Sequence, residues 1–189
     1  MPEIKALTFD VFGTVVDWRS GVAREAEAVL GAKGVTLDWP VFADRWRALY
    51  VPAMSRVSRG ERPFAVLDDL HRENLVALLK MDRIENLADE DIDRLNLAWR
   101  KLDPWPDVVE GLSRLKRRFI LATLSNGNIA LMVAAHASDL RAAAARGFRT
   151  AYVHRPDEYG ATERARPWPT DAFDYAVEDF GALADALGA

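Results

Sequence analysis

One carboxylate of the sequence stands where a nucleophile could act. Asp10 follows residues 4–9, which are apolar apart from one lysine and one threonine. Gly13 and Thr14 come directly afterwards, so the chain can turn sharply and place a hydroxyl beside the carboxylate. A carboxylate held at the end of a strand can attack carbon or phosphorus. A side chain that only caps a turn is the alternative interpretation.

A second polar motif follows another apolar run. Ser125 and Asn126 come after residues 119–124, which are typical of a buried strand. In a doubly wound sheet the carboxyl ends of such strands meet at one crevice. We therefore expect a hydroxyl and an amide to flank Asp10, and an ordinary Asn-Gly turn is the alternative.

The composition narrows the classes of function. The chain has no cysteine, so the nucleophile must be an oxygen or a nitrogen. Its net charge of −4 argues against a nucleic-acid partner, and its apolar runs are too short for a membrane span. No targeting segment precedes the first apolar run, so we expect a cytoplasmic protein. A homodimer is compatible with the composition.

The hydrophobic pattern predicts an α/β fold: a Rossmann-like parallel sheet core, apparently shortened, with a helical cap inserted after the first strand. Residues 1–17 and 104–189 would form the core, and residues 18–103 the cap. The expected strands are 4–9, 119–124 and 150–153. The expected helices are 20–31, 40–57, 63–80, 89–101, 107–117 and 177–187.

Both motifs resemble those of the haloacid dehalogenase superfamily, Phe-Asp-Val-Phe-Gly-Thr at residues 9–14 and Leu-Ser-Asn-Gly at residues 124–127. Phe12 favours the (S)-2-haloacid dehalogenase branch, because superfamily phosphatases carry there an acid that protonates a departing alkoxide, whereas a halide leaves without a proton. The resemblance implies hydrolysis of a small haloacid with no metal and no cofactor. A phosphatase of the same superfamily is the alternative enzyme.

The resemblance also assigns roles. Asp10 would attack the halogen-bearing carbon and form an ester. Arg47, in a segment similar to the lid helix of the family, would receive the halide together with Asn126. Ser125 and Thr14 would hold the substrate carboxylate.

The chain departs from the family pattern after the second motif. A segment that normally carries a lysine is absent, and no lysine follows Lys116. Residues 133–140 resemble the fourth motif, in which Asp139 would activate water and His136 would contact the substrate. Without a cation beside the nucleophile we expect weak turnover or none, so an impaired, dehalogenase-like binding domain is a further alternative.

The missing segment also affects the predicted topology. Successive parallel strands usually need a crossover of a dozen or more residues, which residues 125–130 do not supply. We therefore expect residues 129–146 to form one helix that ends at Gly147 and keeps Asp139 far from Asp10. The alternative is a deletion product whose fold is strained or completed by a partner chain.

Overall fold

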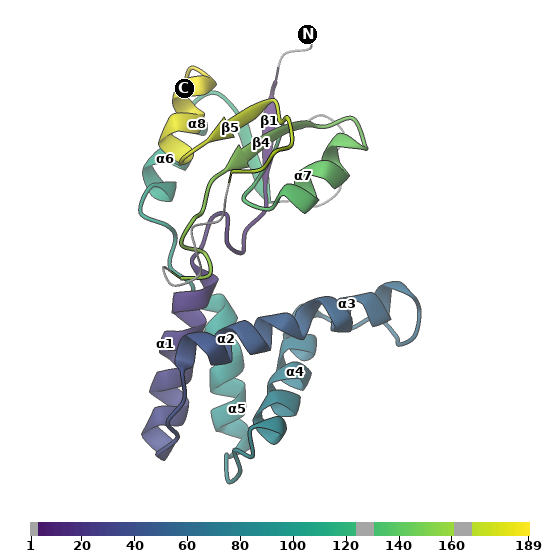
Figure 1. Cartoon of the computed structure of the whole chain (residues 1–189), viewed down its shortest axis with the longest axis vertical. Helices are drawn as coiled ribbons and strands as arrows, with labels where there is room; N and C mark the ends of the chain where they lie inside the picture. Colours follow the sequence, from purple (N-terminus) through teal and green to yellow (C-terminus); the bar gives the residue numbers. More distant parts are fainter. Residues whose placement is uncertain (1–3, 124–130, 161–167) are drawn as a thin grey trace. The chain divides into compact units, whose positions relative to one another are not determined.

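The structure of the chain, a computed structural model, describes residues 4–123, 131–160 and 168–189. Its contacts divide it into two units (Figure 1). The core unit consists of Met1–Asp17 and Asp103–Ala189, and the cap unit is Trp18–Leu102. No helix in the described ranges combines the length and the hydropathy that crossing a lipid bilayer requires.

The core unit is built on a five-stranded sheet in which every neighbouring pair is parallel. Its strand order is β2-β1-β3-β4-β5. The strands are β1 (Ala6–Phe9), β2 (Ile120–Thr123), β3 (Leu131–Ala134), β4 (Arg149–Val153) and β5 (Tyr175–Val177). The helices are α6 (Val108–Leu115), α7 (Ala137–Ala144) and α8 (Phe180–Ala186). The predicted α/β fold with a parallel sheet is confirmed.

Successive side chains of β3 point to opposite faces of the sheet and enter two separate hydrophobic clusters. Val133 joins the cluster beneath α6 and α8, where the rings of Phe9 and Phe180 stack with centroids 5.6 Å apart. Met132 joins the cluster beneath α7, together with Tyr152. Both faces of the sheet are therefore covered, as a parallel sheet requires.

The expectation of one helix over residues 129–146 is wrong. Leu131–Ala134 form β3, which pairs with both β1 and β4, and only Ala137–Ala144 are helical. The conformation of Leu131–Ala134 is decided by pairing with β1 on one side and β4 on the other, which satisfies the backbone groups of this segment within the sheet. The spacing of the apolar residues in 129–146 fits a helix, but a short apolar run such as 131–134 fits a buried strand equally well.

The expectation that residues 125–130 are too few to join two parallel strands is wrong, because β2 and β3 are short and lie on either side of β1. Thr123 pairs with Phe9 and Leu131 pairs with Leu7. The end of β2 and the start of β3 are thus about two strand spacings apart across the sheet and two residues apart along the strands, a distance of roughly 12 Å. The eight peptide units between Thr123 and Leu131 can reach about 27 Å when extended, so the connection is long enough.

The cap unit is helical. Its helices are α1 (Trp18–Leu30), α2 (Trp39–Ala48), α3 (Tyr50–Ser58), α4 (Leu67–Met81) and α5 (Asp89–Asn96), with short 3₁₀ turns at Gly31–Lys33 and Leu97–Arg100. The predicted helix over residues 40–57 is two helices, which separate at Leu49. Asp38 caps α2 by accepting a hydrogen bond from the backbone N–H of Val41.

A buried aromatic cluster holds the cap unit together. The rings of His71 and Trp99 stack with centroids 4.4 Å apart, and those of Trp18 and Trp99 lie 6.1 Å apart. The indole N–H of Trp46 donates to the backbone carbonyl of His71 at 3.0 Å. These rings join α1, α2, α4 and the last 3₁₀ turn into one packed body.

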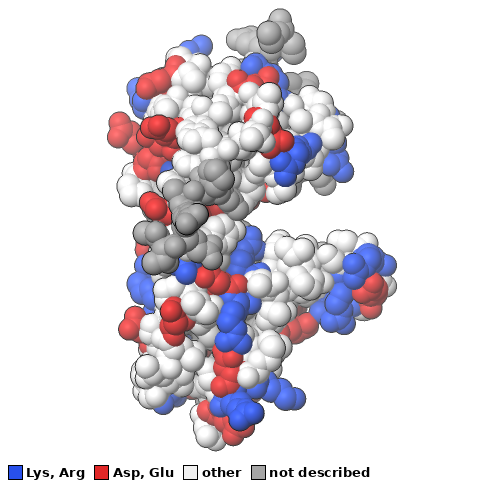
Figure 2. All heavy atoms as spheres, in the orientation of Figure 1, with Lys and Arg blue, Asp and Glu red and all other residues white. Residues whose placement is uncertain are grey.

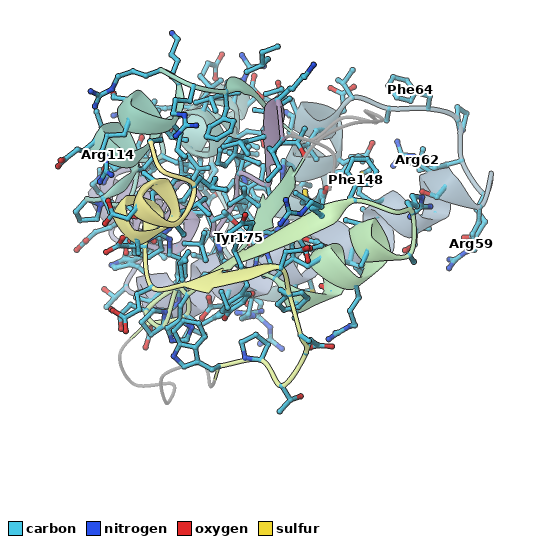
Figure 3. All side chains as sticks on the ribbon, turned by 90° about the horizontal axis from the view of Figure 1, so that it is seen from above. Arg59, Arg62, Phe64, Arg114, Phe148 and Tyr175 are labelled. Atoms are coloured by element: carbon cyan, nitrogen blue, oxygen red, sulfur yellow. The ribbon has the colours of Figure 1, made fainter. Side chains whose placement is uncertain are left out.

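Many charged side chains on the described surface form ion pairs with residues of neighbouring elements. Figure 2 shows acidic and basic groups intermingled on the visible face of the cap unit, in agreement with ion pairs such as Arg45–Asp82 and Arg72–Asp93. In the core unit Arg114, labelled in Figure 3, projects from the last turn of α6 and pairs with Asp185 of α8. Arg114 therefore helps to join α6 to α8.

Candidate active site

Asp10 stands at the carboxyl end of β1. Its backbone N–H donates to the carbonyl of Val133 at 3.1 Å, which ties the residue to β3. Its Oδ2 accepts a hydrogen bond from Thr14 Oγ1 at 2.6 Å. The same hydroxyl, which is fully buried, accepts from the backbone N–H of Ala135 at 2.9 Å. Asp10 and Thr14 are therefore brought together, as the sequence predicts, and β3 supports both.

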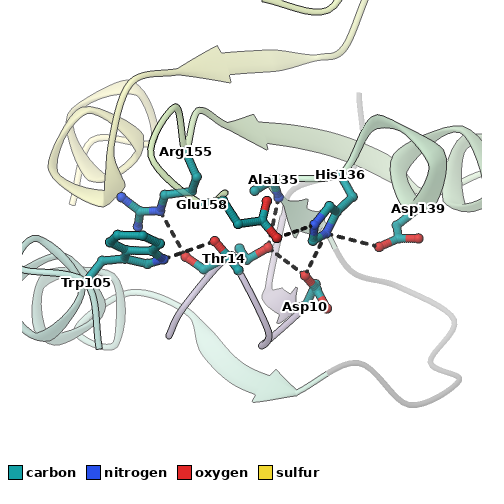
Figure 4. A network of polar contacts seen from close by, with 9 residues as sticks. Asp10, Thr14, Trp105, Ala135, His136, Asp139, Arg155 and Glu158 are labelled. Carbon is teal, nitrogen blue, oxygen red and sulfur yellow. Dashed lines mark hydrogen bonds and ion pairs between the residues drawn. The ribbon is translucent and has the colours of Figure 1, made fainter. Parts of the chain in front are cut away.

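His136 lies between two carboxylates at the end of β3 (Figure 4). Its Nδ1 is 3.3 Å from Asp10 Oδ2, and its Nε2 is 2.9 Å from Glu158 Oε1. Asp139, in the first turn of α7, has its Oδ2 3.7 Å from the same Nδ1. The expected separation of Asp139 from Asp10 is thus wrong, because β3 delivers α7 directly to the site.

The electrostatics of the site follow from these contacts. Burial alone would raise the pKa of Asp10, but hydrogen bonds from His136 and Thr14 and the charge of His136 together lower it. Burial alone would lower the pKa of His136, but its hydrogen bonds to Asp10 and Glu158 and their charges raise it to about 9. At neutral pH the site therefore holds an ionised Asp10 beside an imidazolium.

A second layer of contacts fixes the turn that carries Thr14. The indole N–H of Trp105 donates to the carbonyl of Gly13 at 3.0 Å. Arg155 Nε donates to the carbonyl of Thr14 at 3.1 Å, and its two terminal nitrogens bind the carboxylate of Asp107 at 2.8 and 2.9 Å. A bidentate pair of this kind adds geometric definition as well as energy.

Glu158 explains the glycine in the nucleophile turn. Gly13 has a φ of +88°, and a Cβ at this position would lie only 2.1 Å from Glu158 Oε1. Both the backbone conformation and the close approach of the carboxylate therefore require glycine.

The remaining predicted residues are placed as follows. Phe12 is half-buried in the turn after β1. Arg47 belongs to the cap unit, at the end of α2, where its guanidinium lies 4.6 Å from the ring centroid of Tyr50. Ser125 and Asn126 lie outside the described residues.

Sequence reasoning missed Glu158, Arg155 and Trp105 as parts of the site. A signal for Glu158 and Arg155 was available, because both follow the predicted strand 150–153 and so belong to the same edge of the sheet as Asp10. No local signal identifies Trp105, whose contact with Gly13 joins residues far apart in the chain.

Asp10, His136 and Asp139 each offer one ligand atom, and these atoms lie within 4.8 Å of one another. The set suits a metal poorly, because a histidine coordinates a metal ion only through a deprotonated ring nitrogen. In this site both of its ring nitrogens face carboxylate oxygens that favour the protonated ring. We assign no metal to these residues.

A cavity of about 450 Å³ adjoins the site in the core unit. His136 and Ala135 form one wall, and Tyr152 and Trp168 form another. Arg141 also lines it and pairs with Asp171 at 2.8 Å. The histidine that contacts Asp10 is thus accessible to a small molecule from this side.

Comparisons with known proteins agree with this geometry. Residues 4–184 match the family model of haloacid dehalogenase-like hydrolases. The chain is 32% identical over 134 residues to (S)-2-haloacid dehalogenase 4A of Burkholderia cepacia, an alignment that covers 70% of this chain and 54% of that protein. The chain thus spans about half the length of this curated relative.

Two solved structures resemble the chain over nearly its whole length. The structure of the defluorinating L-2-haloacid dehalogenase Rha0230 has a TM-score of 0.92 and 34% identity, and covers 99% of this chain and 96% of that one. The structure of the L-2-haloacid dehalogenase PA0810 has a TM-score of 0.90 and 32% identity, with 98% and 99% covered.

Proposed function

Because the chain belongs to the haloacid dehalogenase-like hydrolase family, we propose that it hydrolyses short (S)-2-haloacids to 2-hydroxy acids. The observation that carries the proposal is the placement of the Asp10 side chain at the end of β1, where its Oδ2 contacts Thr14 Oγ1 and His136 Nδ1. The relatives named as 2-haloacid dehalogenases support the choice of substrate.

In the first step one oxygen of Asp10 attacks the carbon that bears the halogen, and the carbon-halogen bond breaks as the ester bond forms. The halide leaves with the electron pair, and the carbon inverts. Arg47 and Asn126 are the proposed donors to the developing halide, since a guanidinium and an amide can both stabilise it. Ser125 is the proposed donor to the substrate carboxylate.

Thr14 is better suited to orienting the nucleophile than to holding the substrate. Its hydroxyl is buried, donates to Asp10 and accepts from Ala135. The proton of that hydroxyl is therefore already engaged. This replaces the role that the family resemblance suggested for Thr14.

In the second step water attacks the carbonyl carbon of the ester, which releases the 2-hydroxy acid and regenerates Asp10. Asp139 is the proposed base, because its half-exposed carboxylate lies on the same side of His136 as Asp10. The cytoplasmic location and the homodimer remain predictions.

A phosphatase is the second candidate enzyme, and Phe12 disfavours it. The apolar ring occupies the position at which a phosphatase needs an acid for its leaving group. An inactive binding domain is the third candidate.

Parallel assays of halide release from 2-chloropropionate and phosphate release from small phosphomonoesters separate the three candidates. We expect halide release that Asp10→Asn abolishes and that Asp157→Asn, which changes an exposed neighbouring loop, leaves intact. Phosphate release without halide release would support the phosphatase, and neither activity would support the binding domain.

A further inference from the structure

We propose that Glu158 is a positioning residue that holds His136 as a cation against Asp10, so that the negative charge of the nucleophile is compensated. In this arrangement the histidine and the glutamate act as one charge-compensating pair. The inference deepens the proposed function, on which its catalytic meaning depends.

The geometry favours two donors on the ring. His136 directs Nδ1 at Asp10 Oδ2 and Nε2 at Glu158 Oε1, at 3.3 and 2.9 Å. A neutral imidazole carries one N–H and one lone pair, whereas the imidazolium donates from both nitrogens. Since ionised carboxylates only accept hydrogen bonds, the neutral ring would set a lone pair against one of them. The cation satisfies both.

Glu158 is placed to hold the ring of His136. Its side chain is only 1% exposed, and its Oε1 lies against Gly13, where a Cβ has no room. Its backbone N–H donates to the carbonyl of Arg155 at 3.4 Å, which links it to the residue that supports the nucleophile turn. The carboxylate therefore acts through His136.

The other charged groups around His136 do not cancel the effect of Glu158 on the protonation of the ring. Asp10 at the end of β1 and Asp139 on α7 present oxygens to Nδ1, and Glu158 from the loop after β4 presents one to Nε2. Arg141 on α7 lines the cavity beside the ring, but its guanidinium pairs with Asp171. Among the residues that the structure describes, carboxylates thus dominate the charged surroundings of the ring, which agrees with the raised pKa of His136.

This arrangement answers the expectation that the chain lacks a cation beside its nucleophile. Among the described residues His136 supplies one, although the sequence predicted for this residue only a contact with the substrate. Weak turnover does not follow from the missing lysine alone.

The test is an NMR titration of the histidine rings, of which the chain has three, with His136 assigned from the loss of its signal in His136→Gln. In the wild-type protein His136 should titrate near pH 9. In Glu158→Gln, which keeps the shape but not the charge, its midpoint should fall by about one pH unit or more. Glu178→Gln, a control at an exposed position of the core unit, should leave it unchanged.

Activity supplies an independent readout. The alkaline limb of halide release should move to lower pH in Glu158→Gln, because the imidazolium is then lost at lower pH, and a purely structural role would not produce this shift. If His136 titrates near pH 6.5 in the wild-type protein, or if its midpoint does not change in Glu158→Gln, the proposed charge-compensating pair is wrong. If Glu158→Gln fails to fold, the proposal is tested by the midpoint of His136 in the wild-type protein and by the decrease of that midpoint in Asp10→Asn. Absence of halide release with the expected titration would reject the proposed function and leave the pair standing.

Discussion

Replacing Arg155 by methionine should destabilise the core unit strongly. The guanidinium makes two hydrogen bonds to Asp107 and one to the carbonyl of Thr14. It also lies 5.6 Å from the ring centroid of Trp105 and 5.3 Å from that of Phe180. Methionine keeps much of the apolar stem but leaves the carboxylate of Asp107 without its cation.

The size of the effect follows from burial. Breaking a buried ion pair by removing one partner costs about 3–5 kcal/mol. Arg155 is 8% exposed and Asp107 is 20% exposed, and Asp107 keeps a hydrogen bond from the backbone N–H of Phe180. We therefore expect a loss near the lower end, about 3 kcal/mol, equivalent to a decrease of roughly 6–12 °C in Tm for a chain of this length.

The assay is guanidinium denaturation followed by circular dichroism, with the slope m compared between variants. Arg141→Met is the matched control, because Arg141 and Asp171 form an ion pair at 2.8 Å whose side chains are 58% and 31% exposed. Such a pair should contribute less than about 1 kcal/mol. Equal losses in the two variants would refute the reasoning from burial. Adding Asp107→Asn to Arg155→Met should recover part of the loss.

Three further predictions follow from particular contacts. His71 is buried, and burial together with the charge of Arg47 lowers the pKa of its ring to about 4. Below pH 6.5 the unfolded chain therefore takes up a proton on this ring more readily than the folded chain does. The contribution of the neutral ring to the free energy of unfolding is present above pH 6.5 and is lost as the pH falls towards 4, by up to about 3 kcal/mol. Denaturation of the wild type and of His71→Leu across this range checks it, and parallel pH curves would contradict it. Gly13→Ala should lower halide release at least tenfold while the cap unit stays folded, because the new Cβ displaces Glu158; activity within twofold of wild type would refute this. Arg47→Ala should reduce kcat more than it raises KM, since the proposed charge on the halide develops during displacement; steady-state kinetics measure this split, and an unchanged kcat would reject this role for Arg47.

The sequence predicted the parts of the fold whose signals are local. Asp10 at the end of β1 and Thr14 after a turn could be identified because an apolar run, an acid and a glycine succeed one another directly. The position of β3 could not, because residues 131–134 are too short for their period to distinguish a strand from a helix. Their conformation is decided by pairing with β1 and β4, which are distant in the chain.

The residues of the site likewise include some that the sequence predicts locally and some that it does not. The nucleophile turn follows from its motif, whereas the role of His136 depends on Glu158, 22 residues later in the chain. Neither residue type nor spacing indicates that the two meet. Their contact arises because β3 and β4 are neighbours whose carboxyl ends reach the same edge of the sheet.

Peptide mass mapping of the protein, quenched in acid during turnover of 2-chloropropionate, tests the central claim most directly. If Asp10 is the nucleophile, the peptide that contains it should gain the mass of the substrate less hydrogen chloride, and the same peptide of Asp10→Asn should not. Halide release by the wild-type protein with no adduct on that peptide, or with the adduct on another residue, would contradict the account.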